Sequence, residues 1–209
     1  MKKNILVFPC GSEIALDIYS SVKYSTYFNL IGASSVDDHG KFVFENYIPN
    51  IPFVSDNAFI PTLKKIVKEC HIDAIYPAMD TVITETKLHE KELGCTVIAS
   101  PYETTKICLS KKLTYEKLRN VLNVPKIYES NNIPIEEFPV FVKPVVGYGA
   151  KGTKILYTQE DVNTYLKDKK DMLIVEFLPG EEFTVDCFTD KSGKLLLSLI
   201  HISEPTRPY

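Results

Sequence analysis

Several features that mark common protein classes are missing from this sequence. Its five cysteines are scattered and contain no C-x-x-C pair, so neither a zinc site nor a disulfide framework is predicted. No apolar run approaches the roughly 18 residues of a membrane-spanning helix, and the apolar stretch at residues 5–8 is too short for a signal peptide. These absences predict a cytoplasmic protein with no membrane partner and with reduced, mostly buried thiols.

An excess of one charge is also missing. The chain has 24 Lys and Arg residues against 27 Asp and Glu residues, and the two signs are mixed along its length. Without a basic stripe there is little to neutralise a phosphate backbone, so we expect no nucleic-acid partner. The 209 residues, 44% of them hydrophobic, have the composition of one large or two small globular domains.

Short apolar runs alternate with helical patterns in the first half of the chain. Strands are predicted at residues 4–8, 27–33, 72–76 and 95–99, and helices at 13–24, 61–70, 81–93 and 101–108. Strands joined by crossover helices form a parallel sheet covered on both faces. We therefore predict an α/β fold with a Rossmann-like, doubly wound domain over residues 1–108, whose ligands would bind at the carboxyl ends of the strands.

Those strand ends carry only weak signals. The loop PCGSE after the first strand has one glycine, Gly11, where a dinucleotide fingerprint needs three, which disfavours a nicotinamide-dependent enzyme. Asp80 follows the strand at 72–76 and could contact a ligand. An aspartate at the start of a helix is more often an N-cap, and that is the preferred interpretation.

The pattern changes near residue 109. A basic amphipathic helix in LSKKLTYEKLRNVL and a connection rich in proline and asparagine come first. Strands are then predicted at residues 138–143, 153–157, 172–177 and 183–189, with a helix at 160–167. This change predicts a second, α+β domain over residues 109–196.

A glycine-rich loop joins the first two strands of that domain in FPVFVKPVVGYGAKGTKIL. Gly147, Gly149 and Gly152 allow positive φ angles that direct backbone N–H groups toward an anion, while Lys143 and Lys151 supply positive charge. The spacing is not G-x-x-x-x-G-K-[ST], which excludes the P-loop fold. The predicted ligand of the loop is a phosphate, with a merely flexible turn as the alternative.

A second segment, LIVEFLPGEEFTVDCF, follows about twenty residues later. Its apolar strand ends at a Pro-Gly turn, where unpaired backbone N–H and C=O groups suit the edge of an adenine ring. Glu182, just past the turn, can accept hydrogen bonds from ribose hydroxyls. Loop and turn together predict a nucleotide site.

With these motifs in this order, residues 1–196 resemble the ATP-grasp family, in particular its carbamoyl-phosphate-synthase-like and D-alanine–D-alanine-ligase-like members. Residues 1–108 resemble the family's pre-ATP-grasp domain. The resemblance implies ATP contacts of three kinds. The phosphates would contact Lys111, Lys143 and the loop from Gly147 to Gly152, which includes Lys151. Adenine would contact Glu176, Phe177 and Leu178. Ribose would contact Glu182. Asp186 matches a recurring acidic position of uncertain role.

The resemblance also implies a reaction. Family members use ATP, with Mg²⁺ expected, to convert a small-molecule carboxylate into an acyl phosphate that an amine or related nucleophile attacks. The family's metal-binding acids and catalytic arginine lie on later strands, so no catalytic or metal residue is assigned and the ATP-grasp domain is expected to be incomplete. A homo-oligomer is one expectation for its assembly. The alternative function is a non-catalytic, nucleotide-binding regulatory protein.

The end of the chain has an unusual sequence. LSLIHISEPTR, residues 197–207, matches one reading frame of the transposase adaptor used to prepare sequencing libraries over eleven consecutive positions. Two prolines and the lack of an apolar period predict that HISEPTRPY cannot continue a sheet. We therefore expect residues 197–209 to be a non-native tail in which His201, Glu204 and Arg207 have no function. An irregular native C-terminus is the alternative.

Overall fold

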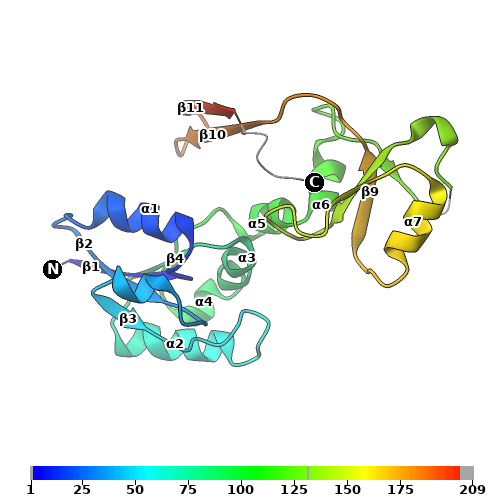
Figure 1. Ribbon diagram of the computed structural model, residues 1–209. Coiled ribbons are helices and arrows are strands. Elements are labelled where there is room, and N and C mark those ends of the chain that lie inside the picture. The colour runs from blue at the N-terminus through cyan, green and yellow to red at the C-terminus, as the bar shows by residue number, and fades with distance from the viewer. Residues whose placement is uncertain (1, 131, 203–209) are drawn as a thin grey trace. The chain divides into compact units, whose positions relative to one another are not determined.

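The chain divides into two compact units, Met1–Ser110 and Lys111–Tyr209. The computed structural model describes residues 2–130 and 132–202. Both units combine helices with sheets (Figure 1). Within the described ranges, no helix has the length and apolar character required to cross a membrane.

The first unit is built on a parallel sheet of five strands, which confirms the predicted α/β class. The order across the sheet is β3-β2-β1-β4-β5, so the chain changes direction across the sheet between β1 and β4. The strands are β1 (Lys3–Phe8), β2 (Phe28–Ala33), β3 (Asn46–Ile48), β4 (Ala74–Pro77) and β5 (Thr96–Val97). Four were predicted, and the three-residue β3 was not.

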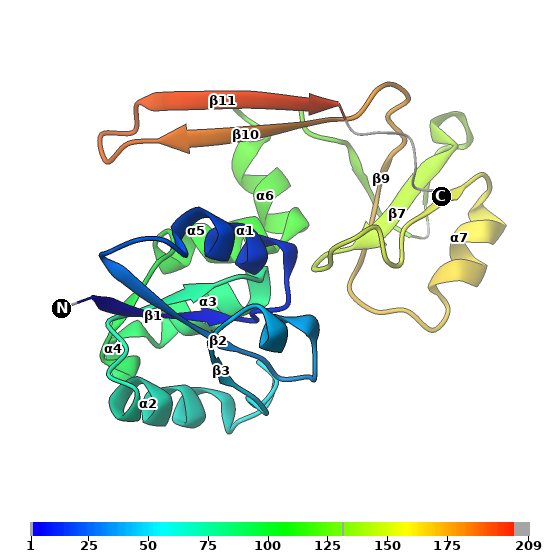
Figure 2. The ribbon, with the colours of Figure 1, turned by 60° about the vertical axis from the view of Figure 1, so that its left-hand side comes forward.

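Helices cover both faces of this sheet (Figure 2). They are α1 (Glu13–Val22), α2 (Phe59–Glu69), α3 (Asp80–Leu88), α4 (Glu90–Leu93) and α5 (Tyr102–Leu109), with a 3-10 turn η1 (His39–Phe42). Alternation along β1 sets the two cores, because Leu6 and Phe8 pack with α2 while Ile5 and Val7 pack with α1. The single helix predicted at 81–93 is wrong, since the chain forms α3 and α4 with a break at His89.

Asp80 is not the N-cap that the sequence suggested. It is the first residue of α3, and the capping position belongs to Met79, whose backbone is extended and whose side chain makes no capping bond. The Asp80 backbone carbonyl accepts a hydrogen bond from Thr84 Oγ1 at 3.1 Å. Its carboxylate therefore lies at the positive end of the helix dipole without satisfying a capping role.

The prediction that most thiols are buried is also wrong. All five are free, but only Cys10 is buried; Cys70 and Cys95 are half-buried, and Cys108 and Cys187 are exposed. Burial, together with the negative charge of Asp38, raises the pKa of Cys10 to about 12. The thiolate is therefore scarce at neutral pH, and Cys10 serves the core rather than chemistry.

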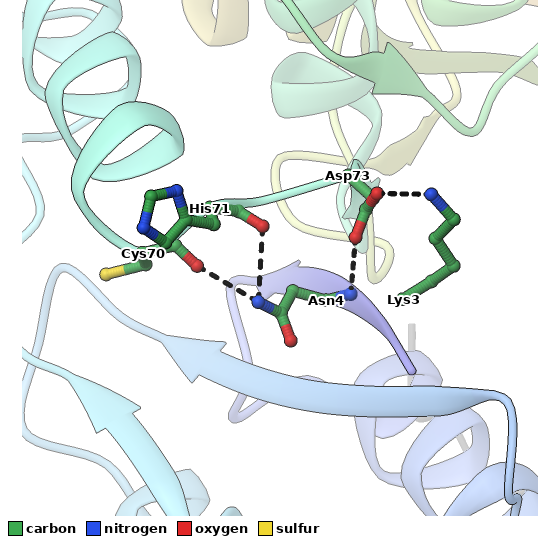
Figure 3. A network of polar contacts seen from close by, with 5 residues as sticks. All are labelled: Lys3, Asn4, Cys70, His71 and Asp73. Carbon is green, nitrogen blue, oxygen red and sulfur yellow. Dashed lines mark hydrogen bonds and ion pairs between the residues drawn. The ribbon is translucent and has the colours of Figure 1, made fainter. Parts of the chain in front are cut away.

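A polar network fixes the amino ends of β1 and β4 (Figure 3). The Asp73 carboxylate accepts hydrogen bonds from Lys3 Nζ at 2.6 Å and from the Asn4 backbone N–H at 2.8 Å. The Asn4 side-chain amide donates to the backbone carbonyls of Cys70 and His71 at 3.1 and 3.2 Å. These bonds tie the end of α2 and the start of β4 to β1, at the opposite end of the strands from any ligand edge.

We expect Asp73→Asn to lower the thermal stability of the chain at pH 7, and to lower it by less near pH 3. The hydrogen bonds from Lys3 and Asn4 hold the pKa of Asp73 below its ordinary value, so the carboxylate stabilises the fold above that ordinary value and ceases to do so as acid protonates it. Thermal melts at both pH values test this. Asp37→Asn, which removes only an exposed pair with Lys41, is the control, and an equal loss for Asp73→Asn at both pH values would contradict the account.

The second unit contains an antiparallel sheet of four strands in the order β6-β9-β7-β8. The elements are β6 (Ile127–Tyr128), β7 (Val140–Pro144), β8 (Lys154–Leu156) and β9 (Met172–Glu176), with α6 (Lys111–Leu118), η2 (Ile135–Glu137) and α7 (Gln159–Leu166). The pairing of β7 with β8 confirms the predicted hairpin around the glycine loop. The two-residue β6 was not predicted.

The two faces of this sheet have different roles. Val140 and Val142 of β7 are fully buried in a core that includes Val162 of α7. Because side chains alternate along a strand, Phe141 and Lys143 lie on the opposite face. That face is the one available to a ligand.

A separate two-stranded sheet pairs β10 (Phe183–Thr189) with β11 (Leu195–Ile202). Every residue of β10 is exposed. The prediction that HISEPTRPY cannot continue a sheet is wrong for its first two residues, since His201 and Ile202 lie in register with Thr184 and Phe183. Both prolines come later in the sequence, so the backbone N–H groups of β11 are intact. The rest of the predicted tail, 203–209, lies outside the described residues.

Candidate functional site

One cavity of about 780 Å³ lies within the second unit, on the face of the sheet that bears Phe141 and Lys143. Ile155 and Val175 complete its apolar lining on the strands, in agreement with the register that places both beside Phe141. The start of α6, the glycine loop and the turn between β9 and β10 supply the rest of the lining. A cavity of this size suits a small molecule or a nucleotide.

Nine of the ten predicted site residues line this cavity. They are Lys111, Lys143, Gly147, Gly149, Lys151, Glu176, Phe177, Leu178 and Glu182. Gly152 does not line it. The Gly152 carbonyl accepts a hydrogen bond from the Tyr165 hydroxyl at 3.1 Å, and a Cβ at Gly152 would come within 3.2 Å of Pro144, so this glycine packs at the base of the loop.

The positive φ angles predicted for the loop glycines occur at Gly149 and Gly152 but not at Gly147. Gly149 and Gly152 have φ angles of 64° and 73°, and Ala150 between them has 56°. Left-handed residues turn successive N–H groups toward one side of a loop, which is the arrangement that cradles anions. The Thr153 hydroxyl donates to the Ala150 carbonyl at 2.8 Å and helps to close the turn.

Three lysines supply positive charge beside the loop. Lys111 Nζ donates to the Gly147 carbonyl at 2.9 Å, which attaches the start of α6 to the loop. Lys143 Nζ donates to the Tyr115 hydroxyl at 2.6 Å and lies 5.8 Å from the centre of the Phe141 ring. Lys151 Nζ lies 5.6 Å from the centre of the Tyr148 ring. The charges therefore converge on one end of the cavity.

The other end is formed by the turn that follows β9. Strand register places Glu176 opposite Val140, while Lys143 lies opposite Leu173. Three residues of strand span roughly 10 Å, so the turn and the lysine end are separated along the length of the cavity. Glu181 and Glu182 line the turn end. The cavity is thus polarised, with cations at the loop and carboxylates at the turn.

Within residues 2–130 and 132–202, no three His, Cys, Asp or Glu side chains are grouped so that they could hold a metal ion. The cationic side chains that line the cavity are Lys111, Lys143 and Lys151.

The two acids of uncertain role lie outside the main cavity. Asp80 lines a smaller cavity of about 240 Å³ in the first unit, beside Tyr76 and Ser100. Asp186 is an exposed residue of β10. Neither position adds a carboxylate to the cavity at the glycine loop.

Sequence reasoning missed the apolar and aromatic lining of the cavity. Phe141 and Val175 could have been found from the alternation in VFVK and LIVE, which assigns one face of each strand to a core and the other to a ligand. Tyr115 could have been found from its spacing, because it lies four residues after Lys111 on the same face of α6.

Comparison with known proteins agrees with this arrangement. Residues 108–203 match the model of the ATP-grasp domain. D-alanine–D-alanine ligase from Petrotoga mobilis is 25% identical over 116 residues, which cover 53% of this chain and 39% of that protein.

Solved structures match a larger part of the chain at low identity. L-amino acid ligase from Bacillus licheniformis has a TM-score of 0.72 at 17% identity. The match covers 98% of this chain and 52% of the ligase chain. N5-carboxyaminoimidazole ribonucleotide synthetase from Thermotoga maritima has a TM-score of 0.65 at 21% identity, covering 93% of this chain and 51% of its own. The biotin carboxylase domain of Hydrogenobacter thermophilus 2-oxoglutarate carboxylase, solved with MgADP and bicarbonate, has a TM-score of 0.70 at 16% identity over 93% of this chain and 49% of its own.

These likenesses establish the fold, and the chain spans about half the length of the solved relatives that it matches. The family match and the shared architecture extend over the cavity and its glycine loop. Residues 108–203 therefore match the ATP-grasp domain, and most of the chain is similar in fold to the ligases and the biotin carboxylase domain named above.

Proposed function

We propose that the cavity of the second unit binds ATP, with the phosphates at the glycine loop and the adenine at the turn after β9. The observation that carries this proposal is the convergence of Lys111, Lys143 and Lys151 with the loop at one end of a single cavity. Hydrogen bonds to charged groups contribute about 1.5–3 kcal/mol each. A polyphosphate can use several of them at once.

The nucleoside end of the proposal rests on the turn and the apolar floor. Phe177 and Leu178 line the cavity through a segment that has just left the sheet, so their backbone groups are suited to the edge of a planar base. Phe141, Ile155 and Val175 supply apolar surface for its ring faces. Glu182 is the proposed acceptor for ribose hydroxyls.

For the complete protein we propose an ADP-forming ligase. A carboxylate oxygen of a small-molecule substrate attacks the γ-phosphorus of ATP, ADP leaves, and the acyl phosphate forms. An amine then attacks the acyl carbon and releases phosphate, leaving a C–N bond. The amino acid ligase and D-alanine–D-alanine ligase relatives support this class of reaction. Magnesium is proposed as the companion of ATP, supported by the MgADP complex of a relative, although the described residues offer no cluster for it.

Calorimetric titration of the chain with ATP, GTP and adenosine tests the binding proposal. We expect one ATP per chain, and weaker binding of GTP because the turn would meet a different pattern of donors and acceptors on guanine. No detectable ATP binding would overturn the proposal. Binding of ATP by the complete protein without ADP formation in the presence of carboxylates and amines would instead support the non-catalytic, regulatory alternative.

A further inference from the structure

We propose that Tyr115 is a positioning residue that holds the ammonium group of Lys143 for a nucleotide phosphate. This inference rests on the proposed ATP site. Tyr115 lies on α6 and Lys143 on β7, 28 positions apart, and the Tyr115 hydroxyl accepts a hydrogen bond from Lys143 Nζ at 2.6 Å. Both side chains are half-buried and both line the cavity.

The chemistry of the pair leaves the lysine charge available. Elsewhere in the chain, Lys3 and Lys126 are held by the carboxylates of Asp73 and Glu137, which neutralise them. Lys143 is held by a neutral hydroxyl, and among the described residues no carboxylate lies within ion-pair distance of its ammonium group. A neutral acceptor fixes the position of the cation while its full charge remains for an anionic ligand.

The Tyr115 oxygen accepts one hydrogen bond from the ammonium group of Lys143. A lysine ammonium group has three N–H donors, so the other N–H groups of Lys143 remain available to a phosphate oxygen. The Lys143 nitrogen lies 5.1 Å from the centre of the Tyr115 ring, on the side of the hydroxyl that it contacts.

The helix that carries Tyr115 also carries Lys111, another of the three lysines at the phosphate end. Lys111 stands one turn earlier on α6 and fastens the Gly147 carbonyl. A single short helix therefore sets the position of the loop through Lys111 and the position of Lys143 through Tyr115. Lys111 and Lys143, two of the three lysines of the cavity, are thus positioned by α6 before any ligand arrives, which reduces the entropy cost of binding.

Tyr115→Phe tests the proposal because it keeps the ring and removes only the hydroxyl. We expect the affinity for ATP to fall about tenfold, and the affinity for adenosine, which has no phosphate, to stay within about twofold. Tyr128→Phe is the matched control: its hydroxyl donates to Glu137 at 2.6 Å, and Tyr128 does not line the cavity. Both affinities should be unchanged in that variant.

A double variant separates positioning from simple contact. If Tyr115 acts through Lys143, Tyr115→Phe added to Lys143→Met should weaken ATP binding by much less than its effect in the wild-type chain. Wild-type ATP affinity in Tyr115→Phe, or an equal loss for ATP and adenosine, would overturn the inference while leaving the proposed site intact. Equal affinities of the wild-type chain for adenosine and for ATP would overturn both this inference and the proposed phosphate site.

Discussion

Lys143→Met is expected to weaken ATP binding by about 10- to 100-fold, while adenosine affinity changes by no more than about twofold. The substitution keeps much of the aliphatic stem beside Phe141 and removes the charge. The lost energy is that of a charge-assisted hydrogen bond to phosphate in a partly desolvated cavity. Titration calorimetry with both ligands measures the two affinities.

Lys167→Met is the matched control for this variant. Lys167 is an exposed lysine that follows α7 in the same unit and does not line the cavity. Lys167→Met therefore changes the net charge by the same amount as Lys143→Met. A tenfold effect of Lys167→Met would show that general electrostatic attraction accounts for the result. Unchanged ATP affinity in Lys143→Met would contradict the assignment of phosphates to this end of the cavity.

Phe59→Ala is expected to lower the unfolding free energy of the first unit by about 3–5 kcal/mol. Phe59 of α2 is only 1% exposed, and its ring centre lies 5.6 Å from that of Phe8 on β1. Truncation removes this contact and leaves a cavity between helix and sheet. Urea unfolding followed by circular dichroism gives the free energy.

Phe53→Ala provides a control of the same residue type. Phe53 is 61% exposed, so its truncation should cost less than about 1 kcal/mol. Similar losses in the two variants would mean that burial in the α2 core does not decide the stability of this unit.

The short, continuous apolar runs of the first unit predicted its strands from sequence. In β1 the residues Leu6 and Phe8 alternate with Ile5 and Val7, and both sets are apolar because both faces are covered. The strands β3 and β6 were missed because three and two residues carry no period. Their pairing is imposed by neighbouring strands, which single-sequence patterns do not contain.

The residues of the candidate site were predicted from two motifs whose residue types are unusual together in a loop. Glycines beside lysines and a Pro-Gly turn followed by glutamates led to ten predicted site residues, and nine of these ten line one cavity. Their contacts with ATP remain predictions. Tyr115 was missed because a tyrosine on an amphipathic helix is normally a packing residue. Asp80 was misjudged as a cap because the chain stays extended through Met79, a backbone detail that composition does not reveal.

The extent of β11 also differs from the prediction. His201 and Ile202 pair with β10 although the sequence predicted no sheet there, because a proline removes only its own backbone N–H and leaves the residues before it able to pair.

Hydrogen exchange with and without saturating ATP tests the central claim most directly. ATP in this cavity should slow amide exchange in residues 147–153 of the glycine loop and in residues 177–182 of the turn together, because both would contact one ligand. The amides of α7, which packs on the other face of the sheet, should be unaffected. Protection confined to one of the two segments, or protection of α7 alone, would contradict a nucleotide that spans the loop and the turn.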